Sequence, residues 1–118
     1  MQMAQAILFV DDVVRMQAFY QGVLGLPVIT AEPDWVRLDA GGLVLGLHAI
    51  KPPRTRPEPA PERVEAVIKL CFRVDDVDRA REALVAAGVK MRAIYRGTDL
   101  AFCDGIDPEG NVFQVTTR

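Results

Sequence analysis

Val-Asp-Asp-Val at residues 10–13, which returns as Val-Asp-Asp-Val at residues 74–77, is the stretch of sequence that decides the fold. Each copy follows an apolar run with strand-like alternation and precedes a run with helical spacing. Each half of the chain then closes on a similar turn, Asp-Ala-Gly-Gly at residues 39–42 and Asp-Pro-Glu-Gly at residues 107–110. Such a repeat predicts two copies of one structural unit, with a binding surface between their sheets.

Around the repeated motif, the apolar spacing predicts an α+β fold built from two β-α-β-β-β modules. In the first half we expect strands at residues 6–10, 28–31, 35–38 and 43–49, and a helix at residues 14–24 that ends before Gly25. In the second half we expect strands at residues 67–74, 89–95, 100–104 and 111–117, and a helix that ends at Ala87. One aspartate of each motif should cap the helix that follows it, namely Asp11 or Asp12 and Asp75 or Asp76.

The chain of 118 residues is long enough to bury the core of one domain. We expect module one at residues 1–50, a linker at residues 51–65 and module two at residues 66–118. Five of the eight prolines lie in the linker, so it should be extended and exposed. It is either a plain spacer or a flap over a binding surface.

Composition excludes several classes of function. The net charge of -2 offers no basic surface for nucleic acid or for a membrane. No apolar run reaches the roughly 18 residues that span a bilayer, and the first residues do not look like a secretory signal. We therefore expect a cytoplasmic protein, in which Cys71 and Cys103 are buried free thiols rather than a disulfide.

In this order and at this spacing, the motifs resemble the vicinal oxygen chelate superfamily, which includes glyoxalases, extradiol dioxygenases and bleomycin-resistance proteins. The similarity extends over almost the whole chain, and its last part is Asp-Pro-Glu-Gly-Asn-Val-Phe-Gln-Val at residues 107–115. It implies two modules whose sheets curl into an open barrel around a cavity. It also implies a homodimer.

The resemblance further implies four positions that hold a divalent metal in many relatives. In this sequence they are occupied by Gln5, Gly46, Lys69 and Gln114. Such a metal needs imidazole, carboxylate or thiolate donors, whereas these residues offer two amides, no side chain and a cation. We therefore expect neither a metal nor another cofactor. His48, the only histidine, lies two residues past Gly46; it is a half-exposed residue at a strand end, a polar contact to a ligand, or a base or metal ligand.

The mixed faces of the leading strands should line the cavity, since their other faces are purely apolar and should meet the helices. Two cations, Lys69 and Arg73, share one face and need an anion. That anion is either an internal carboxylate (Asp11, Asp75 or Asp104) or an acidic ligand. Trp35 could stack on a planar ligand or simply pack at the rim. The predicted ligand-binding residues are Gln5, Phe9, Trp35, Arg37, His48, Lys69, Arg73 and Gln114.

These observations favour a metal-free protein that binds a small organic molecule, either acidic or planar, in the manner of drug-sequestering relatives. The alternative is a metal-dependent lyase, isomerase or dioxygenase of the same superfamily. A third hypothesis is a metal-free enzyme that uses Lys69 or His48 as nucleophile or base.

Overall fold

Two units, Met1–Pro57 and Glu58–Arg118, make up the computed structural model. It describes residues 1–55, 57–63 and 67–118. The linker expected at residues 51–65 therefore includes three residues outside the described ones, Arg56, Val64 and Glu65. Ala66, where we expected the second module to begin, also lies outside them.

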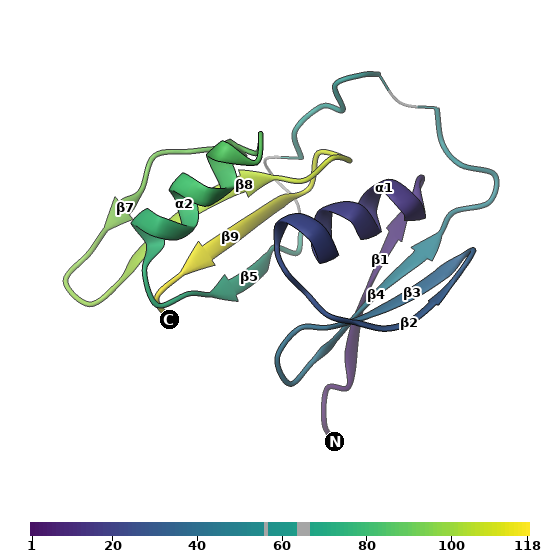
Figure 1. Ribbon diagram of the computed structural model, residues 1–118, viewed down its shortest axis with the longest axis horizontal. Helices are drawn as coiled ribbons and strands as arrows, with labels where there is room; N and C mark the ends of the chain where they lie inside the picture. The colour runs from purple at the N-terminus through teal and green to yellow at the C-terminus, as the bar shows by residue number, and fades with distance from the viewer. Residues whose placement is uncertain (56, 64–66) are drawn as a thin grey trace. The chain divides into compact units, whose positions relative to one another are not determined.

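The first unit is a four-stranded sheet with one helix on one face (Figure 1). Its elements in chain order are β1 Gln5–Val10, α1 Val13–Gln17, the π-helical turn η1 Ala18–Val23, β2 Val28–Glu32, β3 Trp35–Asp39 and β4 Val44–Ala49. The strands lie in the order β1-β4-β3-β2, with β1 parallel to β4 and the other neighbours antiparallel. Asp12 accepts the backbone N–H of Arg15 at 2.9 Å, so the second aspartate of the motif caps the helix.

The helix that we expected at residues 14–24 is not α-helical in its second half. It widens into a π-helical turn, in which the N–H of Leu24 donates to the carbonyl of Phe19 at 3.1 Å. Phe19 and Tyr20 are both buried here, with their rings edge to face at 5.2 Å. Two successive aromatic side chains therefore enter the core, together with Met16 and Val13.

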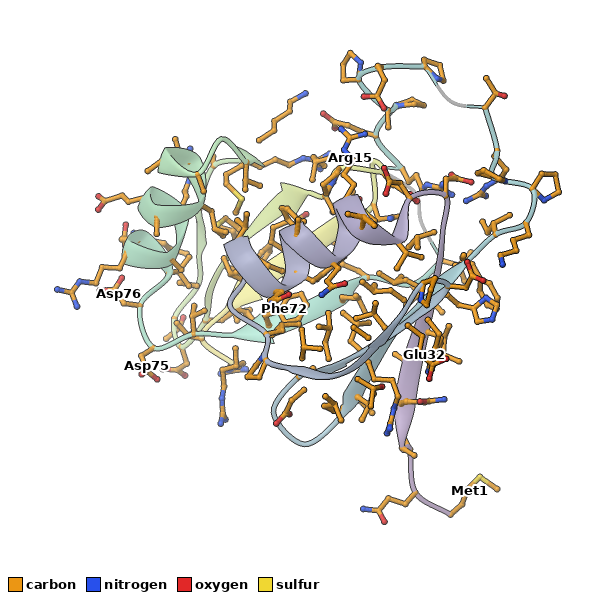
Figure 2. The ribbon with its side chains drawn as sticks, turned by 45° about the vertical axis from the view of Figure 1, so that its right-hand side comes forward. Met1, Arg15, Glu32, Phe72, Asp75 and Asp76 are labelled. Carbon is orange, nitrogen blue, oxygen red and sulfur yellow. The ribbon has the colours of Figure 1, made fainter. Side chains whose placement is uncertain are left out.

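The second unit repeats the plan with more strands. Its elements are β5 Leu70–Arg73, α2 Val77–Ala86, β6 Lys90–Met91, β7 Tyr95–Arg96, β8 Ala101–Ile106 and β9 Val112–Thr116. The sheet order is β5-β9-β8-β6, with β7 also paired to β8, and β5 lies parallel to β9. Asp76 accepts the N–H of Arg79 at 3.0 Å, which again selects the second aspartate as the cap. Figure 2 labels Asp75 and Asp76 at the start of α2.

The α+β fold class is confirmed, and two expected strands need correction. The strand predicted at residues 89–95 is divided into β6 and β7. Arg81 of α2 donates from Nε to the backbone carbonyl of Arg92 at 2.8 Å. In a continuous strand this carbonyl would accept a backbone N–H from the neighbouring strand, so the helix side chain takes its place. The strand predicted at residues 67–74 is limited to Leu70–Arg73, and the exposed Val67 and Ile68 precede it.

Each sheet buries one face beneath its helix. In the first unit Val10, Val36, Leu38, Leu45 and Leu47 are at most 2 % exposed. The leading strands alternate as the sequence predicts, because residues of the helix-facing side are more buried than their neighbours in both β1 and β5. The other face of the first sheet carries exposed side chains such as Ile7 and Phe9, whereas on the second sheet Val112 and Thr116 of that face are also buried. No helix among the described residues is both long and apolar enough to cross a bilayer.

The end of the proline-rich segment is held against the second unit. The N–H of Arg63 donates to the carbonyl of Gly110 at 2.8 Å. Gly110 has a φ of +83°, and a Cβ there would come within 2.2 Å of the carbonyl oxygen of Pro61, so only glycine fits under this segment. Glu62 bonds both Lys90 and Arg92, the latter at 3.1 Å. This part of the expected linker is half-buried rather than free.

Glu62 should make the stability of this contact depend on pH. Hydrogen bonds from Lys90 and then Arg92 lower the pKa of Glu62 below its usual value. Because the folded-state pKa is depressed, the stabilisation is present at neutral pH and is lost as pH falls below about 4, through the lowered pKa. We expect Glu62→Gln to have a lower Tm than the native protein at pH 7. Thermal melts over a pH series should show this difference vanishing in acid, and a difference constant with pH would contradict the role of Glu62.

Candidate functional site

The strand face opposite α1 carries the first set of predicted residues. The strand register places eleven residues on it, and we call this set the helix-free face of unit 1: Gln5, Ile7, Phe9, Thr30, Glu32, Trp35, Arg37, Asp39, Val44, Gly46 and His48. Five of the eight predicted ligand-binding residues are therefore on one surface. Gln5 is exposed at the start of β1, and Arg37 is half-buried opposite Gly46.

Three aromatic side chains lie side by side across this face. Phe9, His48 and Trp35 are direct register partners on β1, β4 and β3. The ring centroids of Phe9 and His48 are 5.3 Å apart, and those of Trp35 and His48 are 5.6 Å apart. Phe9 is 61 % exposed although it is a large apolar residue. An exposed row of aromatic side chains is typical of a surface that binds an organic ligand.

The indole of Trp35 lies directly over Gly46. A Cβ on Gly46 would come within 2.5 Å of the Cη2 atom of Trp35 and within 3.0 Å of its Cζ3 atom. The space that a metal-ligating side chain would need at position 46 is therefore filled by the indole.

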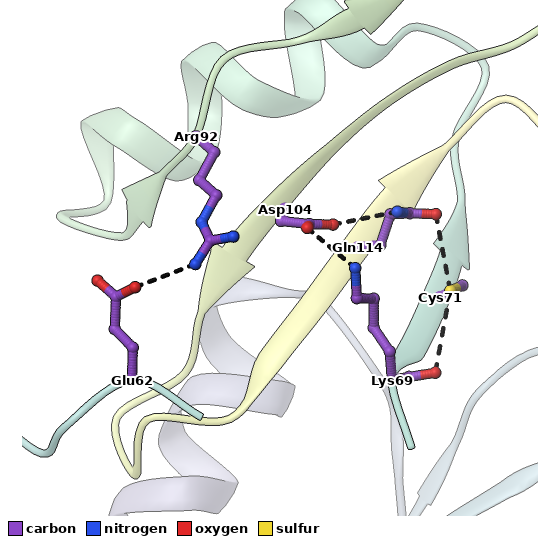
Figure 3. Close-up of polar contacts among 6 residues, drawn as sticks. All are labelled: Glu62, Lys69, Cys71, Arg92, Asp104 and Gln114. Carbon is purple, nitrogen blue, oxygen red and sulfur yellow. Dashed lines mark hydrogen bonds and ion pairs between the residues drawn. The ribbon is translucent and has the colours of Figure 1, made fainter. Parts of the chain in front are cut away.

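Two of the three other predicted residues, Lys69 and Gln114, are joined through Asp104 in the second unit (Figure 3). Lys69 donates from Nζ to Asp104 Oδ2 at 2.9 Å, and Gln114 donates from Nε2 to Asp104 Oδ1 at 3.0 Å. Cys71 lies 3.7 Å from the Oε1 atom of Gln114 and 3.9 Å from the carbonyl of Lys69. The side chain of Asp104 is only 14 % exposed, so it is the centre of this network.

Of the two sources that the sequence left open for the anion beside Lys69, the structure shows the internal one. Asp104 already balances the charge of Lys69. Arg73 shares this strand face, is exposed, and lies in a row with Thr116 and Phe102. It makes no ion pair with any residue that the structure describes. An acidic group could therefore be bound by Arg73 but has no vacant partner in Lys69.

The four positions that hold a metal in relatives do not fit one here. Gly46 lies under an indole, and Lys69 presents an ammonium bonded to a carboxylate. The amides of Gln5 and Gln114 are weak neutral donors, and Gln114 is already bonded to Asp104. Among the described residues, no group of three or more His, Cys, Asp and Glu side chains is arranged around a possible metal position.

Several residues of these faces were not predicted as site residues. Glu32 is placed next to Trp35 by the pairing of β2 with β3. Tyr95 and Phe102 stack at 5.0 Å on the second sheet, in the row that contains Arg73. Their positions depend on strand registers, and no local sequence signal specifies these. Asp104 was only one of three carboxylates considered as a partner for Lys69.

The cysteines are free, as expected. The expected burial is confirmed for Cys103, which is 1 % exposed, and is wrong for Cys71, which lies exposed on the second sheet. Burial raises the pKa of the Cys103 thiol, which keeps it protonated and unreactive.

A hollow of about 310 Å³ lies elsewhere in the first unit, where β1 meets α1. Its charged groups already have partners. Lys51 bonds Asp34, and Arg54 donates to Asp11 from its backbone N at 2.8 Å and from Nε at 3.1 Å. None of the predicted ligand-binding residues lines it, so it is not the candidate site.

Solved structures with the same fold are numerous. The protein SMU.1112c is 24 % identical with a TM-score of 0.79, and the match covers 98 % of each chain. A lactoylglutathione lyase from Agrobacterium tumefaciens is 24 % identical with a TM-score of 0.73, over 98 % of this chain and 92 % of that one. TnmS3, an antibiotic binding protein from Streptomyces sp. CB03234, is 21 % identical with a TM-score of 0.72, over 98 % and 93 %.

None of the curated proteins matches the chain in sequence. The family profile described as Glyoxalase/Bleomycin resistance protein/Dioxygenase superfamily matches residues 2–115, which is nearly the full length. Together with the repeated β-α-β-β-β plan, this match shows that the chain belongs to the glyoxalase/bleomycin resistance protein/dioxygenase superfamily.

Proposed function

We propose that this chain binds a small planar organic molecule without a divalent metal, and that it acts as a sequestering protein of the bleomycin-resistance type. The observation that carries the proposal is the indole of Trp35 lying on Gly46. It puts an aromatic surface where a metal-dependent relative needs a ligating side chain. A planar molecule can stack on such a surface, and the neighbouring rings of His48 and Phe9 extend it.

The second unit supports the same proposal by its charge. At a usual ligand position Lys69 carries a positive charge that is fixed by Asp104. The ammonium cannot ligate a divalent ion, and Asp104, which balances its charge, has both oxygens already bonded, to Lys69 and to Gln114. An organic molecule needs no such ligand set.

TnmS3 shares the fold and is an antibiotic binding protein. Drug-sized aromatic molecules are therefore suitable first probes. Trp35 is the only tryptophan of the chain, so its fluorescence reports on the proposed site without a label. We expect saturable quenching of Trp35 by planar molecules, together with a rise in Tm. A ligand present at one hundred times its Kd stabilises the native state by about 2.7 kcal/mol.

The same protein, purified without chelator, should contain no stoichiometric metal. Trp35→Phe is the matched variant, because it retains an aromatic side chain and removes the signal. Its Tm shift on adding the ligand should be smaller than that of the native protein. Near-stoichiometric zinc, nickel, iron or manganese in the purified protein would contradict the proposal, as would the absence of any Tm shift across a broad set of planar molecules.

A further inference from the structure

A carboxylate stands at the end of the aromatic row. Glu32 on β2 is the direct register partner of Trp35 on β3, so both side chains project from the same face of the sheet. Glu32 is exposed, and it forms no ion pair within the described part of the chain. Figure 2 labels it near the edge of the first unit's sheet. The row across the four strands is therefore Phe9, His48, Trp35 and Glu32.

The whole helix-free face of unit 1 is net negative. Its ionised groups are the two carboxylates Glu32 and Asp39 and the one guanidinium of Arg37, which gives -2 + 1 = -1 with neutral His48. Asp39 also accepts the N–H of Gly41 at 2.8 Å. This bond engages one carboxylate oxygen and does not neutralise the negative charge. The field of this face therefore favours a positively charged molecule.

His48 adds an acceptor in the middle of the row. Its Nδ1 atom lies 3.1 Å from the carbonyl of Ala49. A carbonyl only accepts, so Nδ1 carries the proton in this contact. The Nε2 atom of the neutral ring is then an acceptor, which suits an N–H donor on a ligand.

The ring geometry also suits a cation. The rings of Phe9 and Trp35 are inclined to that of His48 by 56° and 63°, so they do not cover one another as a parallel stack would. Aromatic faces attract a cation placed within about 6 Å of the ring centroid, and tryptophan does so most strongly.

We propose that the molecule bound at this site is a planar organic cation that stacks on Trp35 with its positive charge directed toward Glu32. This inference rests on the proposed function, since it names the class of ligand for the same surface. Arg37 lies one row away from Trp35 and should repel a bound cation. Substitutions of Glu32 and Arg37 should therefore change the affinity for a cation in opposite directions.

The test compares three molecules of nearly equal shape, namely N-methylacridinium, acridine in its neutral form and an acridine carboxylate. Affinities are measured by quenching of Trp35 and by calorimetry. We expect the cation to bind about tenfold more tightly than the neutral molecule, and the carboxylate to bind most weakly. Glu32→Gln should weaken the cation about threefold to tenfold and leave the neutral molecule unchanged, whereas Arg37→Gln should strengthen the cation.

Glu82→Gln is the matched control, because it removes an exposed carboxylate from α2 of the other unit. It should leave all three affinities unchanged. Equal binding of the three molecules, or an equal loss for cation and neutral molecule in Glu32→Gln, would overturn the inference while leaving the proposed function intact. No binding of any of the three would count against both.

Discussion

Gly46→Ala is expected to displace the indole of Trp35 and to weaken the binding of planar molecules about tenfold, which is the order of one lost aromatic stack. The new Cβ would come within 2.5 Å of the indole, closer than carbon atoms approach, so one of the two groups must move. Trp35 is half-buried and the contact is with the far end of its ring, so the side chain is the group that moves.

The cost in stability should be smaller than the cost in binding. We expect a loss of about 1 kcal/mol in the free energy of unfolding, at the low end of the range for overpacked positions. The emission maximum of Trp35 should shift to the red as the indole enters water. Fluorescence, urea unfolding and ligand titration on the same sample measure the three effects.

Gly22→Ala is the control for this variant. Gly22 lies in the helical part of the first unit, and a Cβ there would meet no atom within 4 Å. It should bind ligand as the native protein does and be as stable or slightly more so, because alanine is favoured over glycine in helices. If Gly46→Ala also kept the native emission maximum and affinity, the indole would not be the binding surface.

The repeated motif made most of the fold predictable. A local pattern indicates that each leading strand and each helix exists, and the alternation along β1 and β5 correctly predicted which residues are the more buried ones. The cap at Asp12 or Asp76 is also local, since the acceptor and the donor lie three residues apart. Features that depend on a few neighbouring residues can be inferred from sequence alone.

Two features that the sequence did not reveal depend on distant partners. The break between β6 and β7 involves Arg81, a residue of the preceding helix that takes the carbonyl of Arg92. The contact of Trp35 with Gly46 follows from the register of β3 on β4, and a shift of one residue would put the indole on the other face of the sheet. Counting residues from the repeated motif identified Gly46 as a position that has no side chain to ligate a metal. It gave no sign that an indole fills the space.

Asp104→Ala is the second change for which we expect a large effect. Asp104 accepts from Lys69 and from Gln114 on two different oxygens, and its side chain is 14 % exposed. Its removal leaves two donors without their acceptor in a half-buried network. We expect a loss of about 1–3 kcal/mol in the free energy of unfolding, measured in urea.

Lys69→Ala should cost less, about 0.5–1 kcal/mol, because the lysine side chain is 37 % exposed and water screens its charge. The double variant should cost less than the sum of the two single variants, since the interaction between the two side chains is lost only once. Asp99→Ala provides the comparison. Its carboxylate is 78 % exposed and lies 4.0 Å from Arg118, so its removal should change stability by less than about 0.5 kcal/mol.

The order of these effects separates two roles for Lys69. If Asp104 is the centre of a structural network, Asp104→Ala destabilises the protein more than Lys69→Ala does, and Lys69→Ala leaves the affinity for planar cations unchanged. If Lys69 instead holds an acidic ligand, Lys69→Ala weakens that ligand about tenfold, which is the order of a charge-assisted hydrogen bond, with little loss of stability. The bond between Lys69 and Asp104 at 2.9 Å favours the first result, because a lysine that already has a carboxylate partner gains little from a second one.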